Sequence, residues 1–148
     1  MTPPFDAVHH VCIVVPDIDA AIAFYEKVGI GGWQDFPPLS AFTDLDVPDR
    51  DAFLDLTYKY TDAPGLQLQL CEPGPGNSPQ RQFLDRTGGG VFHIGFVVDD
   101  VDAGAQAARP VGLEPWMYGR RPDSTGFTYL QTPPSAGVTL EIRQSPNS

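Results

Sequence analysis

The sequence is poor in several kinds of residue, and each shortage argues against a class of protein. It has two cysteines in 148 residues, Cys12 and Cys71, without CxxC spacing, so we expect two reduced thiols rather than a disulfide framework. Nine basic residues stand against nineteen acidic ones and form no block, which argues against nucleic acid and anionic membranes as partners. No apolar run approaches the roughly 18 residues of a membrane span, and the first residues lack the features of a signal peptide. We therefore expect a cytoplasmic protein whose partner is a small molecule.

One stretch of the sequence occurs twice. The residues HVCIVVPDIDA at 10–20 return as HIGFVVDDVDA at 93–103, with six of eleven positions identical. Each copy begins with a short β-branched run, typical of a strand, and continues with apolar residues at helical spacing. Asp17 in the first copy, and either Asp99 or Asp100 in the second, is the predicted helix N-cap.

Strand-like segments follow each of the two helices. Those segments are residues 52–61 and 65–72 in the first half, and 113–119, 126–132 and 137–144 in the second. The pattern predicts one domain over 1–148, built from two βαβββ modules at about 6–72 and 91–144. A connector at 73–90 with one short helix joins them. Because each half is small, we expect the two modules to share a core or a site.

Strand parity separates two faces of the predicted sheet. One face is aliphatic throughout, and the other carries polar side chains from four strands: His10, Gln69, His93 and Glu141. Such a face is ordinarily solvated, but Cys12, Phe127 and Tyr129 share it and suit a half-enclosed cavity better. The four polar residues occupy equivalent positions in the two modules. Two imidazoles and two oxygen donors form a plausible ligand set for a divalent ion, whereas parity turns His9 away.

The chain resembles the vicinal oxygen chelate superfamily, which includes glyoxalase I, methylmalonyl-CoA epimerase, extradiol dioxygenases and bleomycin or fosfomycin resistance proteins. The stretches that carry the resemblance are HVCIVVPDIDAAIAFYEKVGI, LQLQLCEPGPGNSPQRQFLDRTGGGVFHIGFVVDDVDA and YLQTPPSAGVTLEI. Within the superfamily it is most similar to the methylmalonyl-CoA epimerase branch, in which a metal-binding Gln or Glu stands four residues before a proline, as Gln69 does before Pro73.

The resemblance implies an α+β fold with paired βαβββ modules, a curled mixed sheet around a metal cavity, and helices on its outer face. It implies a homodimer and one divalent ion, Co, Mn, Ni, Zn, Fe or Mg, held by His10, Gln69, His93 and Glu141. The implied activity is that of an epimerase or isomerase, which removes a proton next to a carbonyl of a small oxygenated carbonyl compound or an acyl-CoA.

Two carboxylates are candidates for moving the proton in such a reaction. Glu141 is one, besides being a ligand. The epimerase branch uses a further glutamate on the third strand of the first module, where this chain has none, and Asp55 is the nearest carboxylate. Residues 31–50 are rich in proline and aromatics, and are expected to form either a specificity loop or a dimer contact. The residues expected to line the substrate site are Cys12, Trp33, Cys71, Phe127 and Tyr129.

Three other functions remain open at this stage. A metal-free binding protein could sequester a drug, although all four metal positions are occupied by suitable residues. A glyoxalase-type lyase would use the same metal. A ring-cleaving dioxygenase would use two histidines and one carboxylate to hold iron, but typically has two pairs of modules where this chain has one.

Overall fold

The two copies of the repeated stretch fold as neighbouring central strands. The computed structural model describes residues 4–146. Strands β1 (Val8–Val14) and β6 (Gly90–Val97) pair antiparallel at the middle of a nine-stranded sheet with the order β2-β4-β5-β1-β6-β9-β8-β7-β3. In each half the first strand pairs in parallel with the last, β1 with β5 and β6 with β9. The predicted α+β fold with a curled mixed sheet is confirmed.

The remaining elements complete the sheet and the helices around it. The other strands are β2 (Gln34–Asp35), β3 (Asp44–Asp46), β4 (Thr57–Ala63), β5 (Leu66–Glu72), β7 (Pro115–Arg120), β8 (Gly126–Leu130) and β9 (Thr139–Gln144). The helices are α1 (Ile18–Lys27), α2 (Arg50–Leu54), α3 (Pro79–Thr87) and α4 (Val101–Ala108), with a 3-10 turn η1 at Leu39–Ala41.

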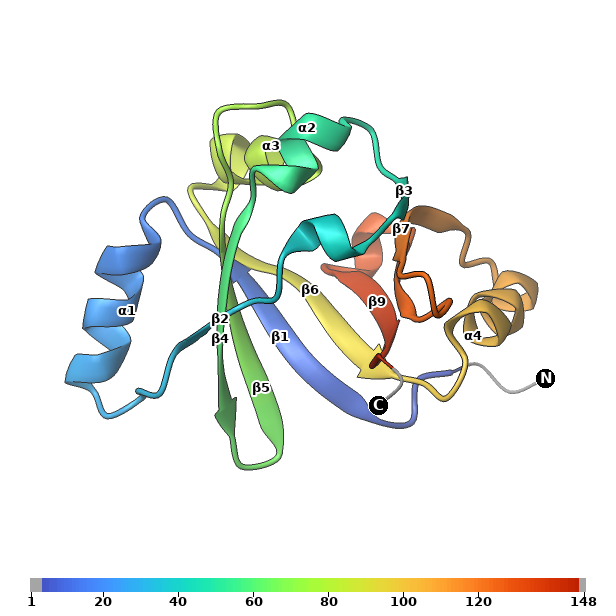
Figure 1. Cartoon of the computed structure of the whole chain (residues 1–148), viewed down its shortest axis with the longest axis horizontal. Helices are drawn as coiled ribbons and strands as arrows, with labels where there is room; N and C mark the ends of the chain where they lie inside the picture. Colours follow the sequence, from blue (N-terminus) through green and yellow to red (C-terminus); the bar gives the residue numbers. More distant parts are fainter. Residues whose placement is uncertain (1–3, 147–148) are drawn as a thin grey trace.

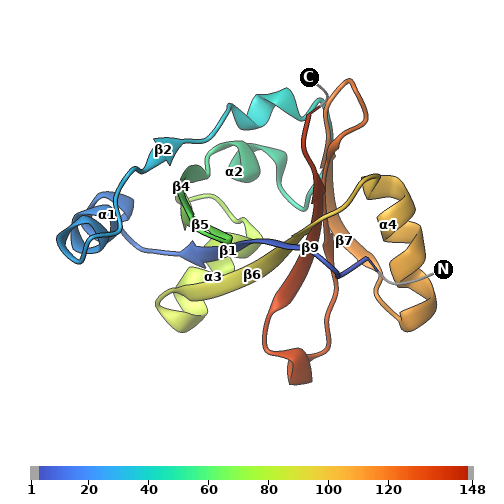
Figure 2. The ribbon, with the colours of Figure 1, turned by 90° about the horizontal axis from the view of Figure 1, so that it is seen from below.

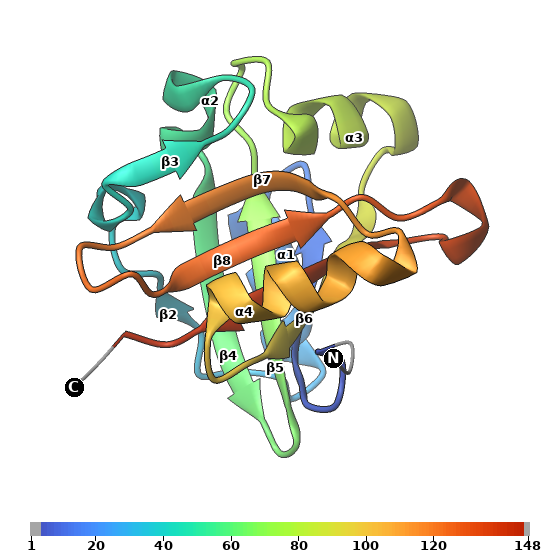
Figure 3. The ribbon, with the colours of Figure 1, turned by 90° about the vertical axis from the view of Figure 1, so that its right-hand side faces the viewer.

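Helices α1 and α4 begin where the sequence predicts and cover the outside of the sheet. The side chain of Asp17 accepts from the backbone N–H of Ala20, and that of Asp100, rather than Asp99, caps α4. Helix α1 packs on the β1 and β5 side, and α4 packs on β8 and β9 through Leu130 and Ile142 (Figures 1 and 3). The aliphatic face of the sheet therefore lies under these helices, and the polar face lies on the concave side.

The strand predicted over residues 52–61 is wrong in its first half. Residues 50–54 form helix α2, and β4 begins only at Thr57. Asp49 caps the helix by accepting from the N–H of Ala52. The neighbours Ala52 and Phe53 are both buried in this helix.

The segment between α1 and α2 joins the two edges of the sheet. Strand β2 pairs with β4 at one edge, and β3 pairs with β7 at the other. The chain between them, which includes η1, therefore crosses the open side of the curl (Figure 2). Of the two roles predicted for residues 31–50, this arrangement favours the loop over the cavity. Within residues 4–146, no helix is both long and apolar enough to cross a membrane.

Candidate metal centre and its cavity

The four predicted ligands lie on four adjacent strands, β5, β1, β6 and β9. Cys12 on β1 stands opposite both Gln69 on β5 and His93 on β6. His10 stands opposite Gly95, which in turn stands opposite Glu141 on β9. Gln69 and His93 thus lie in one row of paired residues, and His10 and Glu141 lie in the next row. The pairing of β1 with β6 places the two rows side by side.

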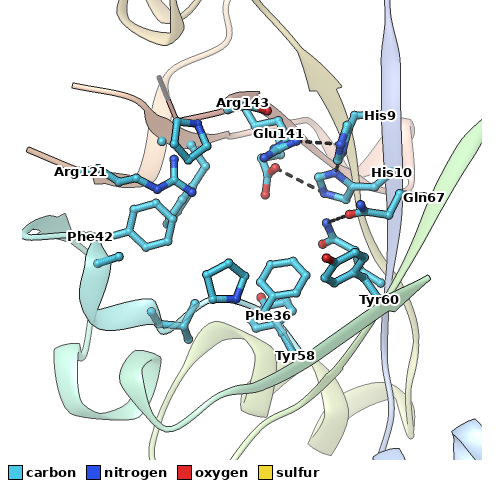
Figure 4. Close-up of a pocket in the computed structure, with 18 of the residues that line it drawn as sticks. His9, His10, Phe36, Phe42, Tyr58, Tyr60, Gln67, Arg121, Glu141 and Arg143 are labelled. Carbon is cyan, nitrogen blue, oxygen red and sulfur yellow. Dashed lines mark hydrogen bonds and ion pairs between the residues drawn. The ribbon is translucent and has the colours of Figure 1, made fainter. Parts of the chain in front are cut away.

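Three of the predicted ligands converge at the centre of the concave face. The Nε2 atoms of His10 and His93 are 2.9 Å apart. One carboxylate oxygen of Glu141 is 3.4 Å from Nε2 of His10, and the other is 3.1 Å from Nε2 of His93. All three residues are buried, and their ligand atoms lie within 4.8 Å of one another. Figure 4 shows His10 and Glu141 directed toward each other across the site.

The protonation states around this cluster suit a divalent cation. Burial lowers the pKa of His10 to about 3, although the charge of Glu141 partly opposes this, so its imidazole is neutral at neutral pH. Burial of Glu141 raises its pKa, but the influence of His93 and His10 outweighs burial and holds the pKa at about 2. Neutral imidazole and ionised carboxylate are the forms that ligate metals. The residues present therefore fit the predicted ion.

A chain of amides orients Gln69, the fourth predicted ligand. The Gln69 amide nitrogen donates to the Gln67 side-chain oxygen at 2.8 Å, and the Gln67 amide nitrogen donates to Asp62 at 3.0 Å. Because a carboxylate only accepts, Asp62 sets the direction of both bonds. The Gln69 side-chain oxygen, which is the atom that ligates a hard cation, is left free of this chain. Gln69 is buried and lines the same cavity as His10 and Glu141.

Gly95 makes room for the His10 ring. A Cβ atom on Gly95 would lie 2.0 Å from Cε1 of His10 and 2.5 Å from each ring nitrogen. The imidazole can therefore lie over β6 and reach His93 only because residue 95 has no side chain. The sequence contains this glycine on the correct face, but nothing in its pattern identifies it as part of the site.

His9 belongs to the site, contrary to the prediction that it faces away. The pairing of β1 with β6 shifts register between Val8 and His10, so simple alternation fails at His9. Its Nδ1 lies 2.8 Å from Nδ1 of His10, and its Nε2 accepts from the Arg143 guanidinium at 2.7 Å. Arg143 follows Glu141 by two residues on β9 and shares its face.

A cavity of about 380 Å³ opens above the cluster. The chain that crosses the open side contributes apolar residues from 36 to 42, and β4 contributes Tyr58 and Tyr60. Phe127 and Tyr129 line the cavity as predicted. Cys12 and Cys71 are instead fully buried in the core beside it. Trp33 packs against Tyr25 with ring centroids 5.6 Å apart and lies outside the cavity lining.

Asp55 is not brought into the site. It is the exposed residue that ends α2, and its carboxylate lies against Gly74, where a Cβ would approach within 2.0 Å. It borders a different surface depression, together with Asp49 and Asp51. The cavity carboxylates are instead Glu141 and Asp62. The prediction for Asp55 depended on strand parity, and the residue does not lie in a strand.

The curled sheet therefore carries two histidines and one carboxylate at its centre, on strands from both halves of the chain. The Glyoxalase/Bleomycin resistance protein/Dioxygenase superfamily model matches residues 9–130, and the chain belongs to this family. It is 30% identical over 105 residues to the ethylmalonyl-CoA/methylmalonyl-CoA epimerase of Cereibacter sphaeroides, covering 70% of this chain and 69% of the relative.

Solved structures of the same family agree with the fold. Methylmalonyl-CoA epimerase from Mycobacterium tuberculosis is 22% identical with a TM-score of 0.72, covering 99% of this chain and 93% of that one. A variant of the Streptomyces coelicolor methylmalonyl-CoA epimerase, in complex with 2-nitronate-propionyl-CoA, is 25% identical with a TM-score of 0.71, covering 97% and 99%. The predicted similarity to the epimerase branch is confirmed.

Proposed function

We propose that this protein is a metal-dependent epimerase or isomerase that removes a proton next to a carbonyl. The observation that carries the proposal is the convergence of His10, His93 and Glu141 within 4.8 Å at the base of the cavity. Gln69 completes the proposed ligand set. The chemistry that a divalent cation would supply there is Lewis-acid stabilisation of an enolate oxygen.

We assign the proton transfer to one carboxylate, that of Glu141. It is ionised, buried and directed into the cavity. Tyr129 stands opposite Glu141 on β8 and also lines the cavity. Burial raises the pKa of Tyr129 and of Tyr58. Both phenols therefore stay protonated, and a phenol O–H at this position can donate a hydrogen bond to a substrate oxygen.

A single base suits an isomerase that returns the proton to a neighbouring atom. It also permits epimerisation when the intermediate is reprotonated from the opposite face by a hydroxyl or water. The relatives are methylmalonyl-CoA epimerases, which supports a substrate with an acidic C–H next to a thioester carbonyl. We therefore include both acyl-CoA thioesters and small oxygenated carbonyl compounds as substrates to be tested.

Deuterium exchange tests the proposal. With 2-substituted acyl thioesters and α-hydroxy ketones in deuterated water, the metal-loaded protein should incorporate deuterium at the carbon next to the carbonyl. Glu141→Gln should abolish the exchange, and His10→Ala and His93→Ala should lose stoichiometric metal in elemental analysis. Asp55→Asn should exchange at the wild-type rate, because Asp55 lies outside the cavity.

Three outcomes would contradict this assignment. Full metal retention in both histidine variants would show that the proposed metal centre is wrong. Loss of deuterium exchange in Asp55→Asn would indicate that Asp55 acts as a second base. Oxygen consumption with a catechol, or tight binding of an aromatic drug without any exchange, would favour a dioxygenase or a sequestering protein instead.

A further inference from the structure

Two arginines that line the cavity form no ion pair with a described carboxylate. Of the nine basic residues in the chain, only Arg121 and Arg143 border this cavity. Within residues 4–146, Arg121 and Arg143 are in no ion pair with an Asp or Glu, and the other basic residues without one, Lys27, Arg50 and Arg86, lie outside the cavity. In a chain of formal charge −10, two such cations facing an internal cavity need an explanation.

Both guanidinium groups are held in place by neutral partners. Arg143 donates through one terminal nitrogen to His9. Arg121 lies over the Phe42 ring at 4.6 Å from its centroid, and its Nη1 donates to the Thr125 hydroxyl at 3.2 Å and to the Gln144 carbonyl at 3.5 Å. Among the described residues, these contacts leave the other terminal nitrogen of each arginine without a hydrogen-bond partner. Each guanidinium group is therefore held in position, but some of its N–H donors have no acceptor.

The two charges also act on each other. Burial lowers the pKa of Arg121, and the charge of Arg143 lowers it further, whereas the charge of Asp123 raises it. Figure 4 shows Arg121 beside Phe42 at the left of the cavity and Arg143 at its top, next to Glu141 and His9. An anion between the arginines would offset their repulsion and supply the missing acceptors. Of the carboxylates that line the cavity, Asp62 accepts from Gln67, and Glu141 contacts both histidines while its charge also acts on Arg143.

The remainder of the lining favours an apolar body attached to that anion. Phe36, Leu39, Phe42, Phe53 and Phe127 form the wall on the side of the crossing segment. A cavity of about 380 Å³ accommodates a small molecule, whereas the nucleotide of an acyl-CoA would have to extend beyond it. A carboxylate matches the planar guanidinium fork and is small enough to lie inside with its apolar body.

We propose that the substrate of this cavity carries a carboxylate that binds between Arg121 and Arg143, with an apolar segment against the phenylalanine wall. This inference rests on the proposed function, since it names the substrate class for the same site. It assigns Arg121 and Arg143 to substrate recognition, separate from the group at which the proton is removed.

A matched pair of probes tests the inference by isothermal titration calorimetry. The probes are 3-phenylpropanoate and 3-phenylpropanamide, which share an apolar body and differ in the charged group. The wild-type protein should bind the carboxylate about 10-fold more tightly or better, as expected for charge-assisted hydrogen bonds. The preference should survive chelator treatment, since it arises from the arginines and not from a cation.

Arginine variants show where the preference originates. Arg121→Gln and Arg143→Gln should each reduce carboxylate affinity by about 10-fold while amide affinity stays constant. Arg121→Lys should recover part of the loss, because it restores the charge without the fork. Arg86→Gln, an exposed arginine outside this cavity, is the control and should bind both probes as the wild type does. Circular dichroism checks that each variant is folded.

Specific results would overturn the inference. Equal affinity for the two probes, or a carboxylate preference that persists in both Gln variants, would remove the arginine site. Tighter, arginine-dependent binding of 2-phenylethyl phosphate than of the carboxylate would assign the site to a phosphate. Failure of deuterium exchange with arginine-dependent binding intact would reject the proposed reaction but not this site.

Discussion

At the residue scale, the glycine beneath His10 determines whether the ligands can meet. Replacing Gly95 with alanine would place a methyl group 2.0 Å from the His10 ring, so the ring must turn away from His93 and Glu141. We expect metal affinity to fall on the order of 10- to 100-fold, the range seen when a ligand loses its supporting geometry. Metal titration measures this.

Gly31→Ala is the matched control for Gly95→Ala. An added Cβ at residue 31 meets no heavy atom within 4 Å. This variant should bind metal as the wild type does. If Gly95→Ala also bound metal normally, the proposed position of the His10 ring would be wrong.

The amide chain from Asp62 to Gln69 is the second feature at this scale. Gln67→Met keeps the length of the side chain but removes the acceptor for the Gln69 amide. Without that acceptor, either end of the Gln69 amide can face the cluster, so metal affinity should drop by about 10-fold. Gln106→Met, on the exposed surface of α4, is the control. Unchanged affinity in Gln67→Met would show that Gln69 needs no such support.

At the scale of elements, a single cap anchors the helix that covers the second module. Asp100 accepts from the N–H groups of Asp102 and Ala103, and α4 then buries Val101 and Ala108 on the sheet. Asp100→Ala should lower the free energy of unfolding by about 1 kcal/mol. Urea denaturation measures it. Asp99→Ala removes a neighbouring exposed carboxylate that is not the cap, and an equal loss there would contradict the assignment.

At the scale of the whole molecule, we expect a homodimer. Val8, Val91 and Val97 on the central strands β1 and β6 are 48%, 46% and 38% exposed, which is unusual for large apolar residues in strands. Light scattering should give about twice the chain mass of 16.1 kDa. Val97→Glu should shift the protein toward a monomer, whereas Val111→Glu, outside these strands, should not. A wild-type monomer at micromolar concentration would reject the dimer.

Much of the site could be predicted because it depends on local rules. Alternation along β1, β5 and β9 places His10, Gln69 and Glu141 on the face opposite the aliphatic residues, and the internal repeat relates His10 to His93. The cap at Asp17 follows from a side chain that reaches the backbone N–H three residues away. These features require only the geometry of a strand or a helical turn, which the sequence by itself determines.

Other features arise only when distant segments meet. Asp55 lies outside the predicted site because residues 50–54 form a helix whose Phe53 stacks on Phe127, although alternation there also fitted a strand. His9 lies in the site because the pairing of β1 with β6 shifts register next to it. Arg121 and Phe42 lie together because β3 pairs with β7, across the sheet from β2. Such contacts depend on pairing energies between residues far apart in the chain, which no local sequence pattern contains. Only the tertiary structure therefore decided that His9, Arg121 and Phe42 line the cavity.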